Sequence, residues 1–127
     1  MARKDGKVLG SLMQTILYVQ EMDRSVHFYK NVLGLTVTYP AGLETYADQA
    51  WVAFDTGGCS LCLHAGGTGR LGADAPSFTF GVADIEFSRS TLIERGVVMG
   101  EIFEAAPGIQ ICRCQDPDGH PFALEMK

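Results

Sequence analysis

A pattern of strand, helix and strand occurs twice in the chain, and this internal repeat limits the folds that the chain can adopt. In the first copy, residues 15–19 are rich in β-branched and aromatic side chains, which favours a strand. Asp23 and Ser25 are residues that start helices, and Gly34 is suited to end one before a second strand at 35–39. The first half of the chain therefore begins with strand, helix and strand.

The second copy follows about 62 residues later, in the same order. Residues 78–82 form the predicted strand, Asp84 starts the helix, and Gly96 ends it before Val97 and Val98. A predicted hairpin completes each copy, so that both halves are βαβββ units. The hairpin strands are 51–54 and 60–64 around the turn 55–58, and 109–114 and 121–126 around the turn 116–119.

Length, charge and hydropathy restrict the domain count and the partners. A chain of 127 residues is expected to be one domain, with units at about 12–65 and 77–127 and a glycine-rich linker at 66–76. The net charge is −5, and the ten Lys and Arg residues are scattered, so nucleic acid and anionic membranes are not expected as partners. No apolar run approaches the roughly 18 residues of a membrane span, and a cytoplasmic location is expected.

Four cysteines, Cys59, Cys62, Cys112 and Cys114, have a spacing that superficially suggests zinc. Residues three apart on a strand face opposite sides, so Cys59 and Cys62 cannot both bind one ion without a turn between them. The cysteines are therefore interpreted as reduced thiols that pack as small apolar side chains.

Two βαβββ units, each ending in a hairpin with a DxxG turn, resemble the vicinal oxygen chelate superfamily of glyoxalase I, extradiol dioxygenases and bleomycin resistance proteins. The most specific segments are residues 23–35, DRSVHFYKNVLGL, and the turn 116–119, DPDG. The resemblance implies an α+β fold in which two curved mixed sheets form a cup around a ligand. It also implies a homodimer, because members of the family complete their cups by pairing modules around a two-fold axis.

The residues that face the cup are predicted from the hairpin turns. If Asp116 pairs with Gly119, then Cys114 opposes Pro121 and Cys112 opposes Ala123. If Asp55 pairs with Gly58, the same alternation places three residues of the first hairpin in the cup. The predicted cup residues of the hairpins are Trp51, Cys62, His64, Cys112, Cys114, Ala123 and Glu125.

The resemblance also implies where a metal would be held. The ligand positions of metal-dependent members correspond here to Gln14, Cys62, Ser77 and Ala123. Divalent cations prefer imidazole or carboxylate ligands, and an alanine supplies no donor. The sequence therefore predicts a protein without a metal cofactor. A divalent metal at Gln14, His64 and Glu125 is an alternative, whereas His120 is expected to be solvated in its turn.

Trp51 is the residue that we expect to stack on a ligand, although packing within the hairpin is an equal alternative. Three functions remain open. The first is a metal-free protein that binds a flat or partly apolar organic ligand in the cup. The second is a metal-dependent lyase or dioxygenase with unusual ligands, and the third is a non-catalytic dimeric module.

Overall fold

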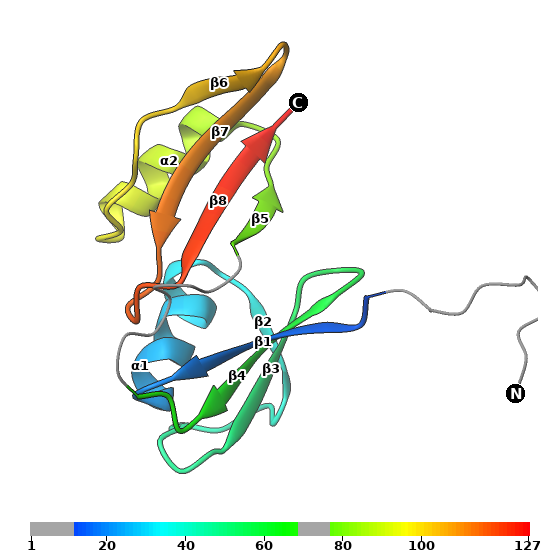
Figure 1. The fold of residues 1–127 in the computed structure, drawn as a ribbon. Helices are drawn as coiled ribbons and strands as arrows, with labels where there is room; N and C mark the ends of the chain where they lie inside the picture. The colour runs from blue at the N-terminus through cyan, green and yellow to red at the C-terminus, as the bar shows by residue number, and fades with distance from the viewer. Residues whose placement is uncertain (1–11, 69–76) are drawn as a thin grey trace, which may run out of the picture.

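The computed structural model describes residues 12–68 and 77–127, which form two four-stranded mixed sheets with a helix on one face of each (Figure 1). We call residues 12–68 module one and residues 77–127 module two. Residues 69–76 of the predicted linker and residues 1–11 lie outside the described residues. Both sheets are open rather than closed, which confirms the predicted fold class.

Module one has the strand order β1-β4-β3-β2, with β1 parallel to β4 and the other neighbours antiparallel. The helix begins one residue before Asp23 and passes directly into a π-helical turn, η1, after which Gly34 adopts a positive φ of 83°. This conformation suits glycine and ends the helix as predicted. The elements are β1 Gln14–Val19, α1 Met22–His27, η1 Phe28–Val32, β2 Thr36–Tyr39, β3 Trp51–Asp55 and β4 Ser60–Ala65.

Module two repeats this arrangement with the order β5-β8-β7-β6. Asp84 caps the helix as predicted, because its Oδ1 accepts a hydrogen bond of 3.1 Å from the backbone N–H of Phe87. Val97 and Val98 form no strand. The strand that follows the helix of module two is β6, which lies further along the chain. The elements are β5 Phe78–Gly81, α2 Ile85–Glu94, β6 Phe103–Ala106, β7 Ile109–Gln115 and β8 Pro121–Met126.

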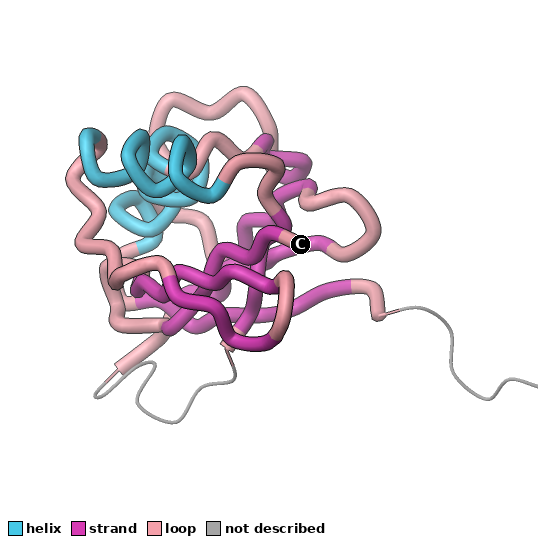
Figure 2. The backbone as a smooth tube through the Cα atoms, turned by 90° about the horizontal axis from the view of Figure 1, so that it is seen from above, coloured by secondary structure: helices cyan, strands magenta, loops and turns pink. Residues whose placement is uncertain are grey.

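Both helices lie on the same side of the strands, as the view of Figure 2 shows. The core lies between these helices and the sheets, where Tyr29 and Ile85 pack against strand residues such as Phe54, Leu63 and Phe122. Burying each of these side chains contributes roughly 1.5–3 kcal/mol. The opposite side of each sheet carries no helix, and we call it the helix-free face.

The turn between β7 and β8, residues 116–120, joins the two modules, and we call it the docking turn. The carboxylate of Asp116 accepts hydrogen bonds from its own turn, at the backbone N–H groups of Asp118 and His120. It also accepts a bond of 2.7 Å from the hydroxyl of Tyr29 in module one. Both ends of this last contact are buried, so the bond between the two modules lies in the interior of the molecule.

The next acidic residue of the docking turn, Asp118, binds the start of α1. Its carboxylate accepts a bond of 2.7 Å from the guanidinium of Arg24 and longer ones from Ser25 Oγ and the backbone N–H of Gln20. The Asp118 side chain is only 1 % exposed. These charge-assisted contacts attach module two to module one at a site more than ninety residues away in the sequence.

His120 closes the docking turn and is also buried, so the prediction that it is solvated was wrong. Its Nε2 lies 2.9 Å from the backbone oxygen of Tyr18, at the end of β1. Because a carbonyl oxygen can only accept, Nε2 carries the hydrogen. His120 therefore ties the docking turn to a strand of module one.

Candidate ligand-binding face

The helix-free face of module one contains the residues predicted for the first hairpin. Trp51 pairs with His64 and Ala53 with Cys62, while Leu61 and Leu63 face the core. Trp51, Cys62 and His64 therefore lie on one face. Gln14 lies on the same face of β1, where it pairs with Ser60.

Three aromatic rings gather on this face, and we call Tyr18, Trp51 and His64 the aromatic cluster. The ring centroids of Tyr18 and His64 are 4.7 Å apart, and Trp51 meets His64 edge to face at 6.0 Å. Tyr18 is 50 % exposed and neighbouring Ile16 is 43 % exposed, so an apolar surface is open above the sheet. Sequence reasoning missed Tyr18, although its alternation with Gln14 along the first strand could have indicated it.

His64 is oriented by its own strand. Its Nδ1 lies 2.7 Å from the backbone oxygen of Ala65, which can only accept, so Nδ1 carries a hydrogen. In the neutral ring, Nε2 is then an acceptor. The cluster thus offers ring faces for stacking and a hydrogen-bond acceptor on a half-buried imidazole.

Cys62 lies at the centre of the same face and is buried by its neighbours. Its Sγ lies 3.9 Å from Oε1 of Gln14. Burial, and to a lesser degree the nearby Cys59, raises the pKa of the Cys62 thiol above its usual range. The sulfur is therefore held in the neutral thiol form, which is a poor nucleophile.

The predicted register of the second hairpin was wrong by one residue. Cys112 pairs with Leu124 and Cys114 with Phe122, so both cysteines face the core under α2 instead of the cup. Desolvation by burial raises the pKa of Cys114 to about 12, and it also raises that of Cys112. A shift of one residue reverses the face of every side chain on a strand, which is why both assignments failed together.

The helix-free face of module two instead carries Arg113, which pairs with Ala123 across the hairpin. On its other side Ala123 pairs with Thr79 of β5, and Glu125 lies on the same face two residues along β8. A hollow of about 470 Å³ lies near the start of β8, at the edge where residues of both faces of the sheet meet. The hollow is lined by Ser77, Arg113, Cys114, Gln115, Pro121 and Phe122.

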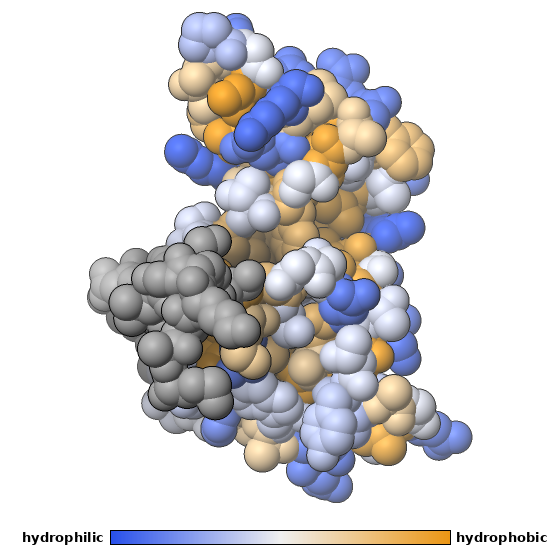
Figure 3. Space-filling view, turned by 90° about the vertical axis from the view of Figure 1, so that its right-hand side faces the viewer, coloured by the Kyte–Doolittle hydropathy of each residue, from blue (hydrophilic) through white to orange (hydrophobic). Residues whose placement is uncertain are grey.

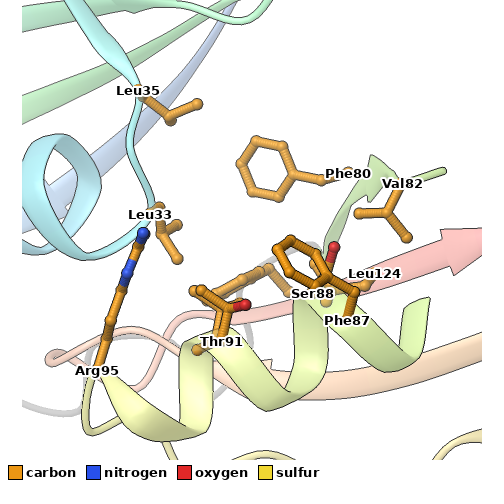
Figure 4. Close-up of a pocket in the computed structure, with 11 residues that line it drawn as sticks. Leu33, Leu35, Phe80, Val82, Phe87, Ser88, Thr91, Arg95 and Leu124 are labelled. Atoms are coloured by element: carbon orange, nitrogen blue, oxygen red, sulfur yellow. The ribbon is translucent and has the colours of Figure 1, made fainter. Parts of the chain in front are cut away.

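A second hollow of about 290 Å³ lies on the helix side, at the junction of the modules (Figure 4). Leu33 and Leu35 of module one face Phe80 and the residues of α2 across it, with Arg95 at one end. The guanidinium of Arg95 donates to the backbone oxygen of Val32 at 2.7 Å. Figure 3 shows apolar side chains gathered at the waist between the modules.

Residues 11–124 match the family model described as Glyoxalase/Bleomycin resistance protein/Dioxygenase superfamily. The chain belongs to this superfamily. The match covers both modules, so the resemblance first drawn from residues 23–35 and the turn 116–119 is confirmed. No curated protein matches the chain significantly.

Solved structures of the superfamily share the fold over almost the whole chain. A putative glyoxalase family protein from Bacillus anthracis has a TM-score of 0.77 at 15 % identity, covering 95 % of this chain and 98 % of its own. TnmS3, an antibiotic binding protein from Streptomyces sp. CB03234, has a TM-score of 0.75 at 17 % identity and covers 94 % and 98 %. Lactoylglutathione lyase from Agrobacterium tumefaciens has a TM-score of 0.71 at 19 % identity and covers 94 % and 96 %. These identities establish a common fold and leave the activity open.

The residues at the superfamily's metal-ligand positions do not fit a divalent cation. Ala123 has no donor atom, and Ser77 and Gln14 offer one neutral oxygen each, which leaves Cys62 as the single thiol among the four positions. Across residues 12–68 and 77–127, no group of three or more His, Cys, Asp or Glu side chains is arranged to hold a metal ion.

The alternative metal site at Gln14, His64 and Glu125 also fails on geometry. Gln14 pairs with Ser60, so His64 lies four residues further along β4. At about 3.3 Å per residue this separates their backbones by roughly 13 Å, far beyond the reach of ligands that share one ion at about 2 Å.

Among the described residues, none of the helices has the length and apolar character needed to cross a bilayer.

Proposed function

We propose that this chain is a metal-free small-molecule-binding protein of the glyoxalase/bleomycin-resistance type. It holds a flat or partly apolar organic ligand against the helix-free face of module one. The observation that supports this function is the aromatic cluster, in which Tyr18 and Trp51 flank His64 on an open sheet surface. Aromatic walls with a few polar groups are typical of sites for such ligands.

The residues next to the aromatic cluster favour ligand binding over catalysis. Cys62 is a buried neutral thiol, and the positions that hold a metal in other members carry donors too weak for one. An antibiotic binding protein is among the solved structures of similar fold, which is consistent with a binding role. The four free thiols suit a reducing compartment, and we infer a cytoplasmic location.

We also propose a homodimer. The helix-free faces of both modules are open in one chain, and Ile16, Tyr18 and Phe103 are large apolar residues exposed on them. Two copies related by a two-fold axis would cover these surfaces and complete each cup. Sedimentation at tens of micromolar should show the dimer, and a monomer at that concentration would contradict it.

The binding function is tested by titrating the full chain with 2-naphthamide, a flat neutral compound, while following the emission of Trp51, the single tryptophan. We expect saturable binding with a change in emission. By calorimetry, Trp51→Ala should weaken binding about ten- to hundredfold, the usual loss for an aromatic anchor of 1–3 kcal/mol. Phe87→Ala is the matched control, because Phe87 is an exposed aromatic on the helix side of module two.

Two results would contradict the proposal. The first is equal binding by wild type and by folded Trp51→Ala protein, which would assign Trp51 to the packing of the hairpin. The second is a stoichiometric metal in the purified protein whose removal by EDTA lowers the melting temperature. We expect less than one equivalent of metal and an unchanged melting temperature.

A further inference from the structure

We propose that the hollow between the modules on the helix side is a second ligand site, which binds a small aromatic molecule with an acidic group. It is the hollow of about 290 Å³ that Leu33 and Leu35 of module one form with Phe80 and α2 of module two, and we call it the junction site. Its lining shares no residue with the aromatic cluster on the helix-free face. The inference therefore does not depend on the proposed function.

One wall of the junction site is apolar and comes from both modules. Leu33 and Leu35 project into it from module one, and Phe80 projects from β5 towards the same space (Figure 4). The buried side chains of Phe122 and Leu124 on β8 also line it. An apolar cavity of about 150 Å³ is enough to hold benzene, so a hollow of about 290 Å³ has room for one ring with a short side arm.

The wall formed by α2 carries a row of polar groups. Ser88 and Thr91 lie on this helix and Arg95 directly follows its end, at spacings of three and four residues that place them on one face. All three line the junction site. Within the described residues, the hydroxyl groups of Ser88 and Thr91 have no hydrogen-bond partner, so they can donate to a ligand. The junction site thus combines an apolar wall with a polar one.

Arg95 gives the junction site a positive charge at one end. One N–H of its guanidinium donates to the backbone oxygen of Val32 at 2.7 Å, which orients the side chain from α2 towards module one. Ion pairs among the described residues involve Arg24 and Arg89 but not Arg95. No Asp or Glu is among the described residues that line the site. An oriented guanidinium with unused N–H groups and no acidic neighbour favours a carboxylate.

The two walls together define the class of ligand. A purely apolar molecule would cover Leu35 and Phe80 but would separate the polar groups of α2 from water without replacing their hydrogen bonds, which costs free energy. An aryl-alkyl carboxylate satisfies both walls, with its ring on the apolar side and its acidic group at Arg95. Because the walls belong to different modules, such a ligand should also raise the melting temperature of the folded chain.

The experiment compares 3-phenylpropanoate with its neutral analogue 3-phenylpropanamide, each titrated into the full chain by calorimetry at neutral pH and low salt. We expect the carboxylate to bind with a Kd below about 1 mM. The amide should bind about three- to tenfold more weakly, a modest difference because Arg95 is exposed and solvent screens its charge. Arg95→Gln should abolish this preference.

Lys30→Gln is the matched control for the charge, because it removes an exposed positive charge that does not line the junction site. It should leave the preference for the carboxylate intact. Equal affinity of wild type for the two compounds, a preference that persists in Arg95→Gln, or a Kd above about 1 mM for the carboxylate would overturn the inference.

Thr91→Phe tests the place of binding, because the larger side chain fills the junction site. It should weaken the binding of 3-phenylpropanoate by about tenfold or more, while the binding of 2-naphthamide at the aromatic cluster stays unchanged. Ser90→Phe is its matched control, since Ser90 is the exposed neighbour on α2 and does not line the site. Unaltered binding of 3-phenylpropanoate by folded Thr91→Phe protein, or binding that Trp51→Ala weakens instead, would overturn the junction site while the proposed function stands.

Discussion

The two hairpin turns occupy the same position in the repeat but have different roles in the structure. The turn of module one, between β3 and β4, is exposed, and Asp55 accepts a local hydrogen bond from the backbone N–H of Gly57. In the docking turn of module two, Asp116 also accepts local hydrogen bonds, but it is buried and binds Tyr29 of the other module. Duplication of a turn motif therefore does not duplicate its contacts, and the second copy has become the joint between modules.

Among substitutions in the two turns and their partners, Asp116→Ala should cause the largest loss of stability. The substitution leaves the Tyr29 hydroxyl and two backbone N–H groups without their acceptor in a buried site. We expect the free energy of unfolding to fall by about 3–5 kcal/mol, measured by urea denaturation. A loss below about 1 kcal/mol would show that the joint between the modules does not depend on this carboxylate.

Tyr29→Phe removes the partner of Asp116 and should cost about 1–3 kcal/mol. It should also change the response to alkaline pH. Burial, followed by the charge of Asp116, raises the pKa of Tyr29 well above its usual range. The folded protein therefore keeps this proton, whereas the unfolded chain loses it near pH 10.

The sign of the pH effect follows from this difference. Below about pH 10 the hydroxyl is protonated in both states and contributes no pH dependence. Above it, wild-type stability should fall by up to about 1.4 kcal/mol per pH unit from this residue alone. Denaturation of both proteins between about pH 9 and 11 should show a shallower decline for Tyr29→Phe; parallel curves would contradict the assignment.

Arg24→Ala should have a moderate effect. It removes the bond of 2.7 Å to Asp118, while Ser25 and the backbone N–H of Gln20 remain as donors to the carboxylate. The Arg24 side chain is 43 % exposed, so solvent screens the pair and we expect a loss of about 1 kcal/mol. The difference from wild type should shrink in high salt; a difference independent of salt would point to packing of the arginine stem instead.

Asp55→Ala should have the smallest effect. The hydrogen bond to Gly57 is exposed and lies within one turn, so we expect a loss of about 0.5 kcal/mol. This variant is the module-one counterpart of Asp116→Ala. If Asp55→Ala and Asp116→Ala lowered the free energy of unfolding equally, the two turns would not differ in their contribution to stability, and the docking turn would not be a joint between modules.

Much of the fold could be predicted because repeat, strand and helix signals are local. The helix cap at Asp84 and the helix end at Gly34 follow from chemistry within a few residues. Hairpin register was less predictable, because both loops are longer than the DxxG pattern suggested. Asp55 pairs with Ser60 and Gln115 with Pro121.

The two register errors had different consequences for the site. In module one the error was two residues, which keeps each side chain on its face, so Trp51, Cys62 and His64 still share one face of the sheet. In module two it was one residue, because His120 is included in the turn through its hydrogen bonds with Asp116. Because of this error, Cys112 and Cys114 were predicted on the helix-free face, where the structure has Arg113 instead. The contact that fixes the turn is tertiary, so neighbouring residues could not reveal it.

The docking turn also sets an order of events during synthesis. Tyr29 and Asp116 are 87 residues apart, and the acceptor belongs to the hairpin of module two, between β7 and β8. As the protein emerges from the ribosome with its N-terminus first, the hydroxyl of Tyr29 has no acceptor at this site until Asp116 has also been translated. The start of α1 therefore acquires its partner Asp118 only after the docking turn has been translated.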